Sequence, residues 1–208
     1  MSLANIMWVA LLVLIIFDVA PDTMKTLKIK QLPAIGICVL ALVLGNLPGF
    51  VAGNWLVLNI GWTVVPLAVY IYLFVRTRDT WQRIGSILAP VVLAYVMYIL
   101  GRSMPDEMNI SWQDGYVWYG MLIGAFCAAL APGSAGAVMG CILSGFVAGT
   151  SQSLISRMRG IYVPVSVGTD QTMAVMLIAV ISALIVRWLI AHVKHRFFTE
   201  KTETSSAV

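Results

Sequence analysis

The chain consists mostly of apolar stretches that are long enough to cross a lipid bilayer. A helix needs about 20 apolar residues to cross the hydrocarbon core. Seven stretches qualify, at about residues 3–20, 32–52, 55–75, 84–101, 116–132, 134–150 and 171–191. Only 11% of the 208 residues are charged, against roughly 25% in soluble proteins. The sequence predicts an all-α, polytopic membrane bundle of about seven helices, with one transmembrane domain at 1–195 and a short polar tail at 196–208.

Basic residues indicate the orientation of this bundle. Lys and Arg gather in cytoplasmic loops, and ten of the 13 lie within 21–31, 76–83 and 187–201. We therefore expect a multi-pass protein of the bacterial plasma (inner) membrane, with its N-terminus outside and its C-terminus in the cytoplasm. A re-entrant hairpin over 116–150 is an alternative that leaves both ends on these sides. The net charge of +4 lies in short loops, which argues against nucleic-acid binding.

Polar side chains interrupt the apolar pattern at two places. Asn59 lies inside the third span, where an unpaired amide costs about 2 kcal/mol or more, so it should face protein or a cavity. The seventh span opens with a polar cluster around Asp170. The predicted substrate-binding residues are Asn46, Asn59, Ser166, Thr169, Asp170 and Gln171. These residues would line a polar pocket between the third and seventh helices, but a helix N-cap at Thr169 and Asp170 is the alternative.

Glycine and proline are placed where they affect helix packing. Glycines recur every four residues, which lets membrane helices approach closely. Members of this pattern are Gly45, Gly49, Gly53, Gly136 and Gly140. They predict tight packing inside the bundle or, alternatively, docking of a second copy or another membrane protein; membrane lipid is the other expected partner. Pro48 and Pro66 break two spans, and such breaks either mark a transporter binding site or are packing kinks.

Two stretches of the chain are similar to each other. Residues 58–63 read LNIGWT and residues 165–170 read VSVGTD, and each has a small polar residue two positions before a glycine. With the expected topology, both run inward from the outer face. This similarity predicts a parallel three-plus-one-plus-three repeat in which the fourth span is the connector.

Sequence signatures of catalysis and of cofactor or metal binding are missing. The sequence has no HExxH motif and no P-loop, and no Cys/His cluster at metal-ligand spacing. We therefore expect no enzymatic activity, no cofactor and no metal. The favoured function is a transporter- or channel-like protein that binds or passes a small polar solute or ion. The alternative is a non-transporting membrane subunit or scaffold that docks a partner through its glycine faces, for example in sporulation.

The segments LNIGWTVVPLAVYIYLF and VPVSVGTDQTMAVMLIAVISAL resemble a family of small, uncharacterised polytopic membrane proteins of bacteria and archaea. The resemblance extends to the YphA-type proteins of spore-forming bacteria. That family carries Asn-Ile-Gly-Gly-x-x-x-Pro in a mid-chain helix and Gly-x-x-x-Asp at the start of the last helix. Here Trp62 replaces the second glycine, and Thr169 directly precedes the aspartate. The resemblance implies a multi-pass bacterial membrane protein and points to Asn59, Gly61, Pro66, Gly168 and Asp170.

Overall fold

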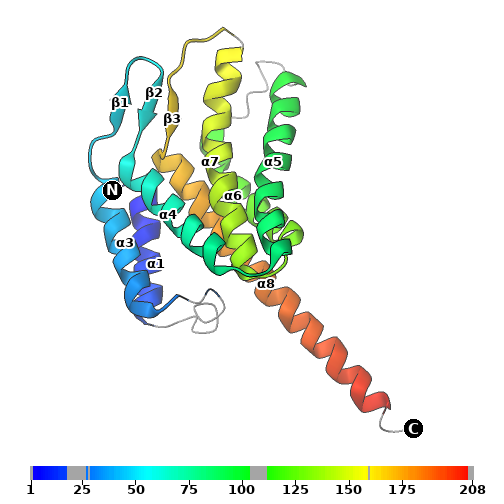
Figure 1. Ribbon diagram of the computed structural model, residues 1–208. Helices are drawn as coiled ribbons and strands as arrows, with labels where there is room; N and C mark the ends of the chain where they lie inside the picture. The colour runs from blue at the N-terminus through cyan, green and yellow to red at the C-terminus, as the bar shows by residue number, and fades with distance from the viewer. Residues whose placement is uncertain (1, 18–26, 28, 104–111, 159, 206–208) are drawn as a thin grey trace.

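The structure is a helical bundle with a small sheet at one end (Figure 1). It is a computed structural model that describes residues 2–17, 27, 29–103, 112–158 and 160–205. The helices in this part of the chain are α1 (Leu3–Ile16), α3 (Gln31–Gly45), α4 (Ile60–Arg76), α5 (Thr80–Ser103), α6 (Trp112–Leu130), α7 (Ser134–Met158) and α8 (Asp170–Ser205). The strands are β1 (Phe50–Ala52), β2 (Leu56–Leu58) and β3 (Val165–Val167). The predicted helical bundle is confirmed in part: the chain is mostly helical, and the prediction omitted the small sheet.

Successive helices run in alternating directions between two ends of the bundle (Figure 1). The sheet end holds the start of α1, the strands and the start of α8. The opposite end, here called the basic end, holds the α4–α5 connection with Arg76 and Arg78. The turn at 131–133 also lies at the basic end, because Gly85, near the start of α5, packs against Ala131. Residues 116–150 therefore run the length of the bundle and back.

Helices α7 and α8 are shared by the two halves of the hydrophobic core. One cluster joins them to α1, α3 and α4, and the other joins them to α5 and α6. Small residues allow these close approaches: a Cβ on Gly61 would collide with the backbone of Leu44, and a Cβ on Gly124 would collide with the carbonyl of Ala179. Inside a bilayer the hydrophobic effect does not drive helices together, so close packing through small residues is the expected source of helix association.

The glycines predicted to dock a partner already contact this chain. Gly45 faces the ring of Trp62, Gly136 faces Gln82, and Gly140 faces Cys127. Gly49 and Gly53 lie outside the helices, next to β1 and in the turn between β1 and β2. Internal packing therefore accounts for the three helical positions, and docking of a partner stays a prediction.

The second and third predicted spans are too long, because the chain between them forms a hairpin. Helix α3 ends at Gly45 instead of residue 52, and α4 begins at Ile60 instead of residue 55. Asn46, Pro48 and Gly49 disfavour further helix, and Gly53 has φ +59° in the turn between β1 and β2. The apolar run at 56–58 reads equally well as a short strand, and here it pairs on both sides.

The sheet explains the similarity between residues 58–63 and 165–170. Strand β2 lies in the middle, antiparallel to β1 and parallel to β3, and Leu56 pairs with Val165. Each of the two stretches therefore runs from a strand through a capping residue into a helix, α4 in one case and α8 in the other. The pairing is offset by two residues from the sequence match, which aligned Leu58 with Val165. The full three-plus-one-plus-three repeat stays a prediction.

Helix lengths differ from those of the seven spans expected. Only Thr80–Ile99, Ser134–Met158 and Asp170–Val193 are long and apolar enough to cross a bilayer among the described residues. Helices α1, α3 and α4 have 14, 15 and 17 residues, or roughly 21–26 Å at 1.5 Å per residue. Residues 18–20 of the first predicted span lie outside the described residues. The predicted tail is helical to Ser205, since no Gly or Pro interrupts it.

Candidate functional site

Asp170 connects the start of α8 to the start of α1. Its Oδ1 accepts a hydrogen bond from the backbone N–H of Ala4 at 3.0 Å. Ser2 caps the same helix end, with its hydroxyl oxygen 3.3 Å from the backbone nitrogen of Asn5. A carboxylate is stabilised both at the N-terminus of its own helix and at that of a neighbour. Asp170 therefore serves two helix N-termini, and it is neither unpaired in the bundle nor free in bulk water.

Asn59 is the N-cap of α4 and also ties α4 to α3. Its Oδ1 accepts from the backbone N–H of Trp62 at 3.0 Å, and its Nδ2 donates to the carbonyl of Gly45 at 2.9 Å. The second bond satisfies one of the last carbonyls of α3, which has no partner within its own helix. The expectation that Asn59 faces protein is met by these bonds, at the end of a helix and not within it.

Asn46 closes the same end of the bundle from α3. It accepts a hydrogen bond from the Nδ2 of Asn5 at 2.8 Å and donates to the carbonyl of Leu42 at 2.6 Å. Asn5 is buried, so this amide pair lies between α1 and α3. It joins those two helices as Asn59 joins α3 and α4.

The other predicted residues lie along β3 and the start of α8. Thr169 caps α8, because its Oγ1 lies 3.2 Å from the backbone nitrogen of Thr172. Ser166 pairs with Val57 in the sheet, and Gln171 is exposed. Gly168 has φ +71°, and a Cβ there would lie 2.6 Å from the hydroxyl oxygen of Thr63. That hydroxyl is buried and has no hydrogen-bond partner among the described residues.

The structure thus brings the predicted polar residues to one end of the bundle. Asn46, Asn59, Thr169 and Asp170 all bond backbone groups at helix ends. The contacts of Thr169 and Asp170 are those of helix-capping residues, which was the alternative interpretation of these two positions. None of the six predicted residues lines either of the two cavities described next, and their role in binding a solute stays a prediction.

A large apolar cavity opens on the side of the bundle among α1, α3, α4, α7 and α8. Its volume is about 440 Å³, within the roughly 300–1,000 Å³ typical of ligand sites. Its lining residues are almost all hydrophobic: Trp8, Leu11, Leu14, Ile15, Leu27, Ile29, Ala34, Ile37, Cys38, Pro66, Val69, Val138, Ile142, Met176, Leu177, Val180, Ile181, Leu184, Ile185 and Trp188. The indole Nε1 of Trp8 is buried and has no hydrogen-bond partner among the described residues. We call this space the lateral cavity.

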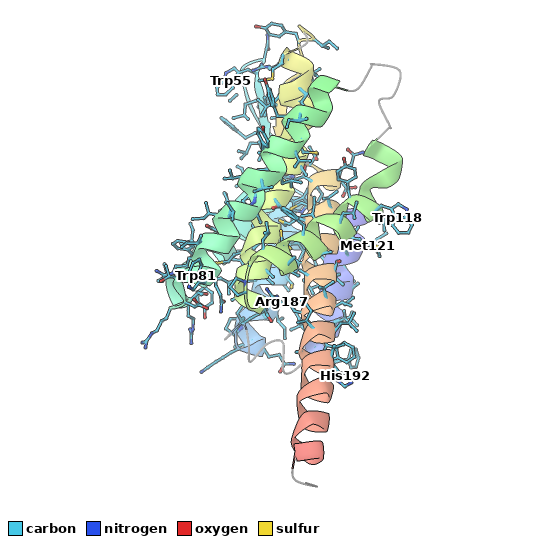
Figure 2. The ribbon with its side chains drawn as sticks, turned by 90° about the vertical axis from the view of Figure 1, so that its right-hand side faces the viewer. Trp55, Trp81, Trp118, Met121, Arg187 and His192 are labelled. Atoms are coloured by element: carbon cyan, nitrogen blue, oxygen red, sulfur yellow. The ribbon has the colours of Figure 1, made fainter. Side chains whose placement is uncertain are left out.

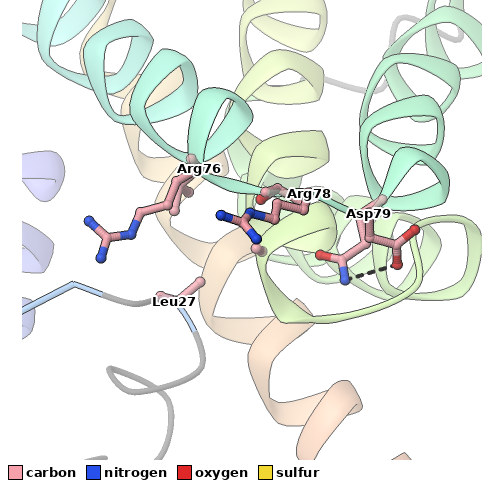
Figure 3. A pocket seen from close by; sticks show the side chains of 8 residues that line it. Leu27, Arg76, Arg78 and Asp79 are labelled. Atoms are coloured by element: carbon pink, nitrogen blue, oxygen red, sulfur yellow. Dashed lines mark hydrogen bonds between the residues drawn. The ribbon is translucent and has the colours of Figure 1, made fainter.

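A smaller polar pocket lies beside the lateral cavity at the basic end (Figure 3). It has a volume of about 240 Å³ and is lined by Leu27, Leu73, Arg76, Thr77, Arg78, Asp79, Gln82 and Ala135. Leu27 lines both spaces. We call this space the basic pocket; its charged side chains come from the connection between α4 and α5.

A further arginine joins two helices near the basic end. Arg187 of α8 donates a hydrogen bond to the carbonyl of Ala131, at the end of α6. A cation at the C-terminal end of a helix is favoured by the helix dipole. Figure 2 shows Arg187 about midway along α8. This contact fixes the turn between α6 and α7 against α8.

No protein-family model, curated protein or solved structure matches this chain. The resemblance to polytopic membrane proteins with an Asn-Ile-Gly motif therefore stays a prediction. Among the described residues, no group of three or more His, Cys, Asp or Glu side chains could hold a metal ion.

Sequence reasoning missed the lateral cavity because its lining is ordinary apolar sequence. Only Pro66 gave a signal, as a break inside a span, and it lines the cavity. Its ring nitrogen cannot donate to the carbonyl of Trp62 one turn earlier. Small side chains such as Ala34 and Cys38 help to leave the space open, but the same residues are equally typical of close helix packing.

Proposed function

We propose that this chain is a seven-span membrane protein that holds a membrane-soluble ligand in its lateral cavity. It lies in a bacterial plasma membrane, with its N-terminus outside the cell and its C-terminus in the cytoplasm. The observation that carries the proposal is the cavity itself: about 440 Å³ of apolar space on the side of the bundle. Molecules reach such a site from the hydrocarbon phase, because its walls offer little to a solute dissolved in water.

The exposed surface supports placement in a bilayer. Large apolar side chains such as Val43, Ile71 and Leu122 are between 59% and 69% exposed. A soluble monomer rarely leaves so many of these side chains in contact with water. Lipid contact explains them without a further partner.

Exposed tryptophans support a placement across two membrane interfaces, and the basic residues support its orientation. Trp55 and Trp118 lie nearer the sheet end than Trp81 does (Figure 2). His192, on which Trp188 stacks with ring centroids 5.3 Å apart, lies further toward the basic end (Figure 2). Tryptophan is enriched at both membrane interfaces, and Arg76, Arg78 and Arg83 at the basic end favour the cytoplasmic side by the positive-inside rule.

Short helices fit this placement if the bilayer thins or if flanking residues reach the interface. The hairpin of β1 and β2 covers the sheet end between α3 and α4 (Figure 1). Strand β2 is paired on both sides and β1 on one side, which lowers the number of backbone groups left unpaired near hydrocarbon.

A pair of valine substitutions on α4 tests the proposal. Val69 lines the lateral cavity, whereas Val64 does not and is 50% exposed. Val69→Trp should fill the cavity and reduce the apolar material that co-purifies with the protein, measured by extraction and mass spectrometry. Val64→Trp is the matched control and should leave that amount unchanged. Equal amounts in Val69→Trp and the unaltered protein would contradict the proposal.

A second candidate function is binding of a small polar solute or ion at the sheet end. The observation that favours it is the buried Thr63 hydroxyl, which has no partner among the described residues and lies beside Gly168. The predicted residues Asn59 and Asp170 lie on the same two helix starts. Solute flux into liposomes that disappears in Thr63→Val would support this function, and its persistence would count against it.

A further inference from the structure

We propose that the lateral cavity and the basic pocket together bind one anionic phospholipid of the cytoplasmic leaflet. An acyl chain would lie in the lateral cavity, and the phosphate group would lie against Arg76 and Arg78. This inference rests on the proposed function, because it names the class of ligand that the lateral cavity holds.

The apolar lining of the lateral cavity alone gives no selectivity between lipids with different headgroups. Acyl chains are as apolar as the leucine side chains around them, so moving a chain from bilayer to cavity gains no hydrophobic free energy. Selection must therefore come from polar groups at the mouth of the cavity. The basic pocket is the polar space that adjoins it, through Leu27.

The charges in the basic pocket fit an anion. Arg76 donates to the hydroxyl of Tyr72 at 2.7 Å, which leaves its other N–H groups available, since a guanidinium has five. Arg78 makes no hydrogen bond or ion pair within the described part of the chain. In Figure 3 both side chains extend on the side of the pocket where Leu27 lies. Arginine guanidinium groups bind phosphate oxygens through their N–H donors, and both arginines line this pocket.

Asp79 forms no ion pair with these two arginines within the described part of the chain, and its one negative charge is fewer than their two positive charges. One oxygen accepts from the backbone N–H of Trp81 at 2.9 Å, and the other accepts from Nε2 of Gln82 at 3.3 Å. No ion pair between Asp79 and an arginine appears in the described part of the chain. The basic pocket therefore keeps a net positive charge.

The pocket also lies at the depth where a phosphate would be. It is formed at the end of α4, in the connection on the basic end, which the proposed topology puts at the cytoplasmic interface. Anionic headgroups lie at this interface, and each nearby Lys or Arg contributes about 1 kcal/mol of attraction to them. The acyl chains of the same lipid extend toward the bilayer centre, as does the lateral cavity from Leu27 toward Trp8.

The test uses the full chain in nanodiscs of equal parts phosphatidylglycerol and phosphatidylcholine. The lipids retained on release into detergent are measured by native mass spectrometry. We expect retained phosphatidylglycerol to exceed phosphatidylcholine, and this ratio to fall roughly fivefold for each arginine removed in Arg76→Gln and Arg78→Gln. Arg157→Gln, at the sheet end, removes the same charge far from the pocket and should leave the ratio unchanged. Arg78→Lys keeps the charge and should retain most of the preference.

Two outcomes separate this inference from the proposed function. If Val69→Trp abolishes retained lipid but Arg76→Gln and Arg78→Gln both keep the anionic preference, the headgroup assignment is overturned and the cavity function stands. Equal retention of both lipids by the unaltered protein overturns it in the same way. If Val69→Trp leaves retained lipid unchanged, the proposed function fails, and the inference fails with it.

Discussion

At the scale of single residues, polar side chains in this protein complete helix ends. Asp170, Asn59 and Thr169 each bond a backbone N–H that has no partner within its own helix. In a bilayer such groups are expensive to leave unpaired. Asp170 caps a helix other than its own, which the sequence could not show because α1 and α8 are 166 residues apart at this contact.

Replacing Asp170 distinguishes a cap from a solute site. Asp170→Ala removes the acceptor of the Ala4 N–H and should lower the free energy of unfolding by about 0.5–2 kcal/mol. Asp170→Asn keeps an acceptor oxygen and should lose less. Denaturation in detergent micelles measures both. A normal stability in Asp170→Ala, together with loss of solute flux, would show that the residue acts in a binding site instead.

Asn59 gives a second prediction at this scale. Asn59→Ala loses the cap on α4 and the bond to the carbonyl of Gly45, so it should destabilise by about 1–3 kcal/mol. Asn59→Asp keeps the cap but cannot donate to Gly45, and its loss should be intermediate. A thermal melt that ranks the two variants in the opposite order would contradict this account.

At the scale of helices and strands, glycine controls how closely helices approach. Gly124→Ala would place a methyl group against the backbone of α8 at Ala179 and should cost about 1–3 kcal/mol. Gly36→Ala is the matched control, because nothing lies within 4 Å of its Cβ position. There the higher helix propensity of alanine should stabilise by up to about 1 kcal/mol. Unfolding in detergent should move in opposite directions for the two variants, and a shared direction would contradict the packing described here.

Helices were predictable from apolar length, but strands were not. The stretches behind α5, α7 and α8 are long and apolar, so their existence followed from the sequence. Their ends did not: α7 continues to Met158 instead of residue 150, and α8 to Ser205 instead of residue 191. Residues 56–58 form a strand because two other segments pair with them, which is a tertiary effect that hydropathy cannot reveal. The polar residues of the sheet end could be picked out as interruptions of the apolar pattern, and their role in a solute site stays a prediction. The lateral cavity depends on how five helices pack, which the sequence does not show.

At the scale of the whole molecule, the alternating helices make a topology that can be tested. Tyr162 is 89% exposed beyond the end of α7, and Thr80 is exposed at the start of α5, at the basic end. In a background with Cys38, Cys127 and Cys141 replaced by alanine, a membrane-impermeant thiol reagent on intact cells should label Tyr162→Cys and spare Thr80→Cys. Labelling of Thr80→Cys alone would reverse the orientation.

Photo-crosslinking with a lipid that carries a diazirine in its acyl chain tests the central claim most directly. After irradiation in nanodiscs, peptide mass spectrometry locates the attached lipid. We predict attachment concentrated on cavity residues such as Trp8, Val69 and Ile181, and strongly reduced there in Val69→Trp. Attachment spread evenly over exposed positions such as Val39 and Leu122, and unchanged in that variant, would contradict a lipid held in the lateral cavity.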